Sequence, residues 1–354
     1  MSYEFEPACR RMEWLDPFYK EVWEKAFADS IPISGTFELT PRCNFNCRMC
    51  YVHLKENQIS KYGEELTAKE WIRIAQEAKE AGTTWLCVTG GEPLMHPEFE
   101  TIWKELSQMG FFITLQTNGS MIRGKMLHLM EKYPPRLAKI SLYGSNDEIY
   151  AAVCGVEKGF TRVNEGIQTL KKLDIPIEIV STVIRQNQDD VIKMAFYAYI
   201  QKIRWAATGN IRKSVRGNDF DVESIRVIKD SETVTGTKIV TDSSREIFMI
   251  PERKPCTYCR DYHVGYWIQW NGKMTFCSFI NEPNISVKNM RLNEAWNQLV
   301  IFEDSLEWPE KCQRCPINKE CIRCVATLAT ESGSIYSVNE KFCEKIVENL
   351  RRKK

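Results

Sequence analysis

The chain has 354 residues, of which 27% are charged, and its formal net charge is +1. This length suits one large domain and a smaller one, since domains usually contain about 100 to 200 residues. The balanced charge, with no basic stretch before residues 351–354, argues against nucleic acid as a partner. No apolar run approaches the roughly 18 residues of a membrane span, and the first residues lack a signal-peptide core. We therefore expect a cytoplasmic protein without a membrane partner.

The predicted elements begin with residues 1–35, whose aromatic residues recur at helical spacing and predict an N-terminal helical extension. From residue 36 to about 208, short apolar runs alternate with amphipathic segments such as 67–81, a pattern that predicts strands alternating with helices. The six predicted strands are 36–40, 85–89, 112–117, 137–142, 177–184 and 203–208. This alternation predicts an α/β fold with a parallel sheet, either open or curled into a partial (β/α)6 TIM-like barrel.

A polar run at residues 230–242 follows the last predicted strand, and we place a domain boundary near residue 235. The three predicted segments are thus the extension 1–35, a core 36–235 and a small C-terminal domain 236–354. Within the last, residues 265–270 and 273–278 flank Asn271-Gly272, which predicts a hairpin.

Distinctive loops follow the first four predicted strands. They are a three-cysteine loop, Gly90-Gly91-Glu92-Pro93, Asn118-Gly119 and Tyr143-Gly144. Ligands of parallel α/β folds bind at the carboxyl ends of the strands, so these loops are expected to share one functional rim.

Fourteen cysteines occur beside only four histidines. In a reducing compartment clustered cysteines indicate metal binding or catalysis rather than disulfides. Cys43, Cys47 and Cys50 form a C-x3-C-x2-C loop, which supplies three thiolates where a closed zinc site or cubane cluster uses four. The coordination position left open is where a ligand could bind. Glycines after the next strand allow close backbone approach to that ligand, and Glu92 can accept hydrogen bonds from an ammonium group.

These two motifs, with the aromatic Tyr51 after the third cysteine, resemble the radical S-adenosylmethionine (radical SAM) superfamily over roughly residues 36–210. The resemblance implies that Cys43, Cys47 and Cys50 hold a 4Fe-4S cluster whose fourth iron chelates S-adenosylmethionine. One-electron reduction would then yield a 5′-deoxyadenosyl radical that abstracts a hydrogen atom from a substrate. The residues that the resemblance assigns to S-adenosylmethionine are Tyr51, Gly90, Gly91, Glu92, Pro93, Asn118, Ser141 and Thr182.

Eight further cysteines between residues 256 and 343 resemble the SPASM extension of radical SAM proteins, which carries two auxiliary 4Fe-4S clusters. The resemblance assigns Cys256, Cys259, Cys277 and Cys324 to one cluster and Cys312, Cys315, Cys321 and Cys343 to the other. Two residues separate Cys321 from Cys324 where the family has three, which leaves the partition of these two thiolates open. Two fully ligated clusters would carry electrons, and so favour a net oxidation of the substrate.

Zinc is the alternative metal, because paired C-x2-C units also occur in zinc ribbons and His53 could complete the first loop. The candidates for acid/base or relay chemistry are Cys154, Asp261 and His263. Sulfatase-maturing relatives place an aspartate after the hairpin cysteine, where this chain has Ser278, so no base is carried over.

The sequence thus predicts a radical SAM oxidoreductase that modifies a peptide or protein side chain by cross-linking or dehydrogenation. An electron donor such as flavodoxin or ferredoxin is the implied partner. Dehydrogenation of a small molecule is the second hypothesis, and a non-catalytic zinc-binding scaffold is the third.

Overall fold

The computed structural model describes residues 17–214, 221–227, 254–256, 259, 262–318, 321 and 324–352. The predicted boundary near residue 235 and the candidate Asp261 lie outside the described residues. The strands are β1 Ser34–Glu38, β2 Trp85–Thr89, β3 Phe112–Thr117, β4 Leu137–Ser141, β5 Ile177–Thr182, β6 Arg204–Thr208, β7 Gly265–Ile268, β8 Lys273–Thr275 and β9 Ile285–Ser286.

The helices alternate with the first six strands and then dominate the C-terminal part. They are α2 Pro17–Ala28, α3 Glu56–Tyr62, α4 Ala68–Glu80, η1 Pro93–Met95, α5 Phe99–Gln108, α6 Lys125–Lys132, α7 Asp147–Cys154, α8 Gly159–Lys172, η2 Gln188–Asp190, α9 Val191–Ile200, α10 Val222–Ile225, α12 Leu292–Ser305, α13 Glu310–Gln313, α14 Val325–Ser332 and α15 Glu340–Arg352. No helix in the described ranges is both long enough and apolar enough to cross a membrane.

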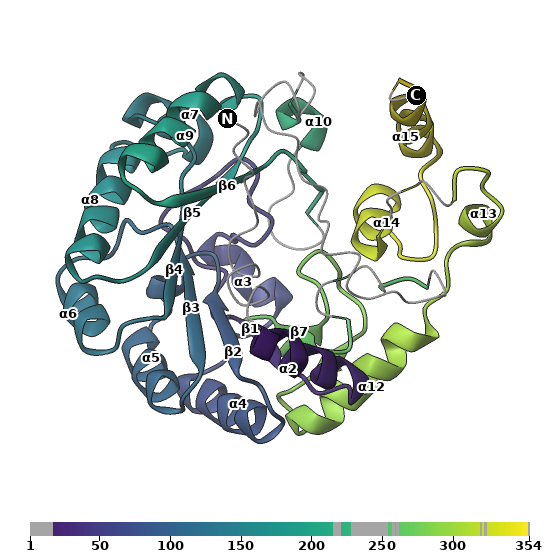
Figure 1. Ribbon diagram of the computed structural model, residues 1–354, viewed down its shortest axis with the longest axis horizontal. Coiled ribbons are helices and arrows are strands. Elements are labelled where there is room, and N and C mark those ends of the chain that lie inside the picture. Colours follow the sequence, from purple (N-terminus) through teal and green to yellow (C-terminus); the bar gives the residue numbers. More distant parts are fainter. Residues whose placement is uncertain are drawn as a thin grey trace.

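One sheet joins all of the described strands in the order β6-β5-β4-β3-β2-β1-β7-β8-β9. Strands β1 to β6 are parallel, which confirms the predicted α/β fold. Figure 1 shows this sheet as a curved wall, with α4, α5, α6 and α8 along its outer side. The C-terminal helices α13 and α14 lie on the opposite side of this view.

The predicted hairpin is present, and its first strand also extends the main sheet. Strand β7 pairs antiparallel with β8 and parallel with β1, where Ser34 lies opposite Gly265 and Phe37 opposite Ile268. Helix α12 strengthens this junction, since Trp296 Nε1 donates to the Ser30 carbonyl at 2.7 Å and Leu292 N donates to Glu77 at 2.7 Å. Residues far apart in the chain therefore share one continuous sheet.

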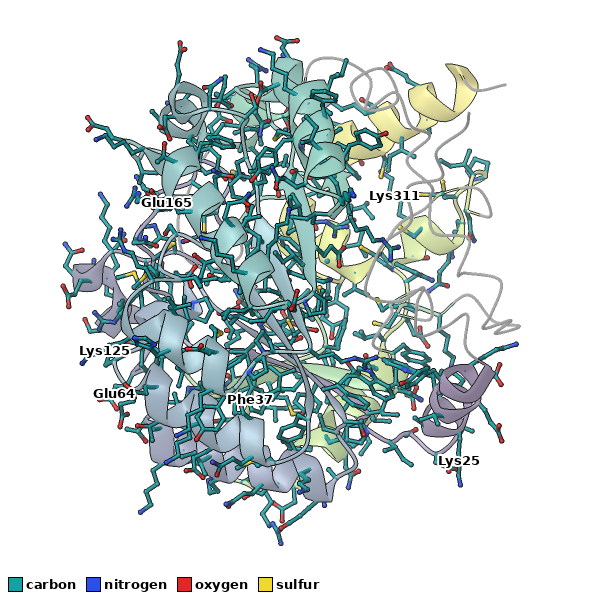
Figure 2. All side chains as sticks on the ribbon, turned by 60° about the vertical axis from the view of Figure 1, so that its left-hand side comes forward. Lys25, Phe37, Glu64, Lys125, Glu165 and Lys311 are labelled. Atoms are coloured by element: carbon teal, nitrogen blue, oxygen red, sulfur yellow. The ribbon has the colours of Figure 1, made fainter. Side chains whose placement is uncertain are left out.

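The core lies between the sheet and its outer helices. Helix α4 begins with a reciprocal cap between Thr67 and Glu70, and its buried Trp71, Ile74 and Ala78 recur every three or four residues. The Trp71 ring packs on Phe37 of β1 with centroids 5.0 Å apart. Figure 2 shows Phe37 in the interior, whereas the labelled lysines and glutamates lie at the periphery.

Candidate functional site

The three-cysteine loop follows β1 and is anchored from two sides. On one side Arg42 donates to Glu65 at 2.8 Å and to Glu56 at 2.9 Å. On the other side the backbone amides of Asn46 and Arg48 donate to carbonyls at the end of α7, both at 2.9 Å. The loop conformation is thus fixed by contacts outside the cysteines themselves.

The three thiols of this loop are sheltered and act on one another. Burial and, second to it, the nearby Cys47 raise the pKa of Cys50 to about 11. Burial also raises the pKa of Cys43, with Glu92 as the second cause. Because the thiolate is the metal-binding form, a bound metal is what would stabilise these sulfurs as anions in this surrounding.

The glycine motif after β2 packs directly on the cysteine loop. A Cβ on Gly91 would lie 2.4 Å from the Arg42 carbonyl oxygen, and one on Gly90 would lie 2.8 Å from the Thr40 carbonyl oxygen. The Gly91 amide donates to that Thr40 oxygen at 2.6 Å, and the Glu92 amide donates to the Arg42 oxygen at 2.7 Å. The missing side chains therefore allow the two loops to form one cradle.

Glu92 lies beneath this cradle and is fully buried. Its carboxylate accepts hydrogen bonds from the Thr117 hydroxyl at 2.7 and 2.9 Å, the Asn118 amide at 2.8 Å and the Leu94 amide at 3.2 Å. Burial raises the pKa of Glu92 to about 7, although these hydrogen bonds oppose the shift. In this structure Glu92 joins the ends of β2 and β3.

This burial predicts a pH-dependent stability. Since the pKa of Glu92 is raised from 4.5 to about 7, its protonated form is favoured by folding. The metal-free protein should therefore be most stable below about pH 4.5 with respect to this group, and lose roughly 3 kcal/mol as the pH rises through 7. Denaturant unfolding at pH 5 to 8 measures the effect, and Glu92→Gln should lack this part of the slope. Equal slopes in both proteins would contradict the assignment.

A cavity of about 440 Å³ opens above the strand ends, a volume typical of ligand sites. All three loop cysteines border it, together with Tyr51, Gly90, Gly91, Asn118, Ser141 and Thr182. Six of the eight residues predicted for S-adenosylmethionine thus meet at one cavity. The other two, Glu92 and Pro93, lie behind its wall, where Pro93 begins η1.

The opposite side of the cavity carries cysteines from the C-terminal part, namely Cys259, Cys277 and Cys324. The Cys259 thiol and burial raise the pKa of Cys256, while burial raises that of Cys277 to about 12, with Cys259 and Cys324 adding to it. Cys277 thus lies near each of Cys256, Cys259 and Cys324, the other three thiols that the resemblance assigns to one auxiliary cluster.

The remaining four predicted ligands lie away from the cavity. Burial raises the pKa of Cys343, and Cys321 and Cys315 raise it further, so these three thiols are neighbours. Cys312 is buried beside Trp308 and Leu328. Among the described residues, no three His, Cys, Asp or Glu side chains are placed to hold a single metal ion.

The two described candidates for acid/base or relay chemistry, Cys154 and His263, are not among the residues that border the cavity. His263 lies at the far end of β7, where Nε2 is 2.9 Å from Asp304 and Nδ1 is 3.4 Å from the Ser30 hydroxyl. Cys154 is fully buried at the end of α7, and its nearby thiol, together with burial, raises the pKa of Cys47. His53 is half-buried after the loop, and burial lowers its pKa.

Sequence reasoning missed Arg212 and Phe279, which both border the cavity. Arg212 Nη1 donates to Cys324 Sγ at 3.2 Å, and its guanidinium lies 5.4 Å from the Phe279 ring centroid. The Phe279 ring in turn packs on Tyr51 at 4.5 Å. Phe279 could have been found from the sequence, because it stands two residues after Cys277. Arg212 belongs to no motif and gave no such signal.

The residues present fit an iron–sulfur cluster with one open coordination position. The donors are three thiols on one loop, and the adjoining glycine backbone packs against that loop where a side chain would clash with its carbonyl oxygens. Polar groups of Asn118, Ser141 and Thr182 complete the cavity wall.

Comparison with known proteins also supports an iron–sulfur site of this kind. The sequence model of the Radical SAM superfamily matches residues 37–198. An AdoMet-dependent heme synthase of Methanosarcina barkeri is 23% identical, over 87% of this chain and 95% of its own length. The sporulation killing factor maturation protein SkfB of Bacillus subtilis is 26% identical, over 75% of this chain and 67% of its own.

Solved structures share the fold. Streptococcus suis SuiB bound to S-adenosylmethionine aligns with a TM-score of 0.67 and 18% identity, covering 90% of this chain and 80% of SuiB. SuiB bound to its precursor peptide SuiA aligns with a TM-score of 0.64 and 16% identity, covering 95% and 82%. The cysteine loop, the glycine cradle and the parallel sheet agree with the family match, which identifies residues 37–198 as a radical SAM domain.

Proposed function

We propose that this chain is a cytoplasmic radical SAM oxidoreductase of the SPASM type that oxidatively modifies a peptide or protein side chain. The observation that carries the proposal is the shared cavity, because thiols of the cysteine loop and of the C-terminal part border the same space. A substrate held there would contact both. The proposed domains remain residues 1–35, 36–235 and 236–354.

In this proposal Cys43, Cys47 and Cys50 hold the first 4Fe-4S cluster, and the eight later cysteines hold two auxiliary clusters as assigned above. If these residues hold the clusters, the first cluster and its bound S-adenosylmethionine would supply the chemistry for hydrogen-atom abstraction, and the electron left on the substrate would pass to an auxiliary cluster as the substrate loses a proton to solvent. Electrons enter from a donor such as flavodoxin or ferredoxin.

The chain's own residues have separable tasks in this cavity. Gly90 and Gly91 let their loop pack closely on the cysteine loop. Tyr51, Asn118, Ser141 and Thr182 supply aromatic and polar surface for the nucleoside and methionine parts of the cofactor. Asn118 is oriented by a 2.9 Å hydrogen bond from its amide nitrogen to Asn44 of the cysteine loop. The apolar Phe45, Met49 and Phe276 limit water in the rest of the wall.

A peptide substrate is supported by SuiB, whose solved structure holds the precursor peptide SuiA, and by SkfB, which is named as the maturation protein of the sporulation killing factor. The cavity of about 440 Å³ has to hold the cofactor and the reacting group together. This favours a single side chain reaching in from a larger molecule.

A small-molecule substrate is the second candidate, favoured by a specific observation. The alignment with the heme synthase extends over 95% of that protein, whereas the alignment with SkfB extends over 67%. An enzyme of this kind would dehydrogenate a compact molecule at the same cavity.

Metal content and cofactor cleavage test the proposal. The full chain, purified and reconstituted without oxygen, should contain about twelve irons in three cubanes, and should release 5′-deoxyadenosine from S-adenosylmethionine only when a reductant is present. A colourless protein that contains zinc under these conditions would contradict the proposal. A protein that contains all of the iron but leaves S-adenosylmethionine intact would also contradict it.

The two substrate classes are separated by offering the loaded protein short peptides encoded beside its gene. Mass spectrometry should then show a peptide that has lost hydrogen. If these peptides stay unchanged while a small alcohol, amino sugar or tetrapyrrole is oxidised, the second candidate replaces the first.

A further inference from the structure

We propose that Arg212 raises the reduction potential of the iron–sulfur site held by Cys277 and Cys324. The inference rests on the proposed function, since it assigns iron–sulfur chemistry to these thiols. It goes beyond that function by naming a residue, outside every cysteine motif, that makes this site an electron acceptor.

The first argument is the contact itself. Arg212 Nη1 donates a hydrogen bond of 3.2 Å to Cys324 Sγ, and the Thr327 hydroxyl lies 3.2 Å from the same sulfur. Hydrogen bonds to cluster sulfurs are among the factors that set an iron–sulfur potential. Thr327 reaches this sulfur because Cys324 stands just before α14, three residues ahead of it.

The second argument is charge. Apart from the cysteines, Arg212 is the one ionisable side chain with a permanent charge among the described residues that border the cavity. Adding one electron makes a cluster and its thiolates more negative by one unit. A fixed cation at hydrogen-bond distance favours that reduced state, most strongly where water is excluded.

The third argument is that Arg212 is held in place. Its guanidinium lies over the Phe279 ring at 5.4 Å, and Phe279 packs on Tyr51. The preceding carbonyl, that of Ile211, accepts from Arg226 Nε at 3.3 Å and Nη2 at 3.2 Å, and Arg226 also pairs with Glu331 of α14. The same ion pair thus fixes both the arginine segment and the helix that follows Cys324.

Arg212 acts through the metal site in this proposal, so it is a positioning residue and its test is a potential. The background is the full chain with Cys43, Cys47 and Cys50 replaced by alanine, which leaves only the auxiliary sites. Dithionite supplies the electrons, and electron paramagnetic resonance follows each reduced cluster. Arg212→Met and Arg212→Gln both remove the charge, and Gln keeps an amide donor.

Both variants should lower the reduction potential of one of the two auxiliary clusters by at least about 59 mV. For one electron this is a tenfold change in the reduction equilibrium. The other potential should stay unchanged and serves as an internal reference. Arg185→Met is the matched control, since Arg185 is an exposed arginine that donates to the Glu223 carbonyl at 3.1 Å. It should leave both potentials where they are.

Unchanged potentials in an iron-loaded Arg212 variant would overturn the inference and leave the proposed function standing. A shift of equal size in Arg185→Met would also overturn it, because any surface charge would then suffice. If Arg212→Met loads no cluster, Arg212→Gln decides by the same criterion. Zinc in place of iron at these thiols would instead defeat the proposed function.

Discussion

Replacing Cys47 with alanine is expected to abolish the reductive cleavage of S-adenosylmethionine. Cys47 is the middle ligand of the loop, and its thiol borders the cavity. Losing only an outer partner of a metal ligand already costs about 10- to 100-fold in affinity or activity, so losing the ligand itself should cost at least about 100-fold. The measurement is 5′-deoxyadenosine release per protein under reductant, with iron content determined on the same sample.

Cys87→Ala is the matched control for this loss. Cys87 is a partly buried cysteine in β2, and it is absent from the cavity wall. Its removal should cost under about 1.5 kcal/mol and leave the iron content and cleavage rate unchanged. Cleavage by Cys47→Ala at the wild-type rate would exclude the three-cysteine loop from the reaction, and a loss as large in Cys87→Ala would show general unfolding.

Replacing Gly91 with alanine should also remove the first cluster, although no metal ligand changes. The added Cβ would meet the carbonyl oxygens of Arg42 at 2.4 Å and Pro41 at 2.8 Å, and backbone atoms cannot move away as a flexible side chain can. The Arg42 oxygen is held by the Glu92 amide and the Pro41 oxygen by the Leu54 amide. The cysteine loop must therefore shift, at a cost of about 1–3 kcal/mol or more.

We expect Gly91→Ala to contain roughly four irons fewer than the wild type, and to release little 5′-deoxyadenosine. Gly209→Ala tests the same chemical change where the nearest atoms lie 3.7 and 4.0 Å from the added Cβ, which is ordinary contact. That variant should keep its iron. Full iron loading and cleavage in Gly91→Ala would show that the cradle tolerates a side chain.

Local sequence patterns predicted most of the core strands. The bounds predicted for β2 and β3 agree with the structure, while the first strand was predicted at 36–40 and runs over Ser34–Glu38. The fifth was predicted to reach residue 184 and ends at Thr182, where its pairing with β6 stops opposite Thr208. The apolar residues after Thr182 lengthen the predicted strand, but the observed strand ends where its pairing with β6 ends.

Contacts between distant segments could not be predicted in the same way. The hairpin is visible in Asn271-Gly272, but nothing local indicates that β7 would pair with β1, because parallel pairing leaves no turn signal. Arg212 was missed for a related reason, since its meaning depends on Cys324, more than a hundred residues away. The glycines were correctly singled out, but the structure adds a reason, as the cysteine loop itself needs the space beside them.

The pairing of β1 with β7 has a consequence for how the chain is made. Strand β1 lies between β2 and β7, and its second neighbour begins at Gly265. Until the ribosome has produced that segment, one side of β1 presents unpaired amides and carbonyls, which are a template for pairing with other chains. A nascent or truncated chain ending before residue 265 is thus prone to aggregate, and expression of the core alone should give insoluble protein where the full chain stays in solution.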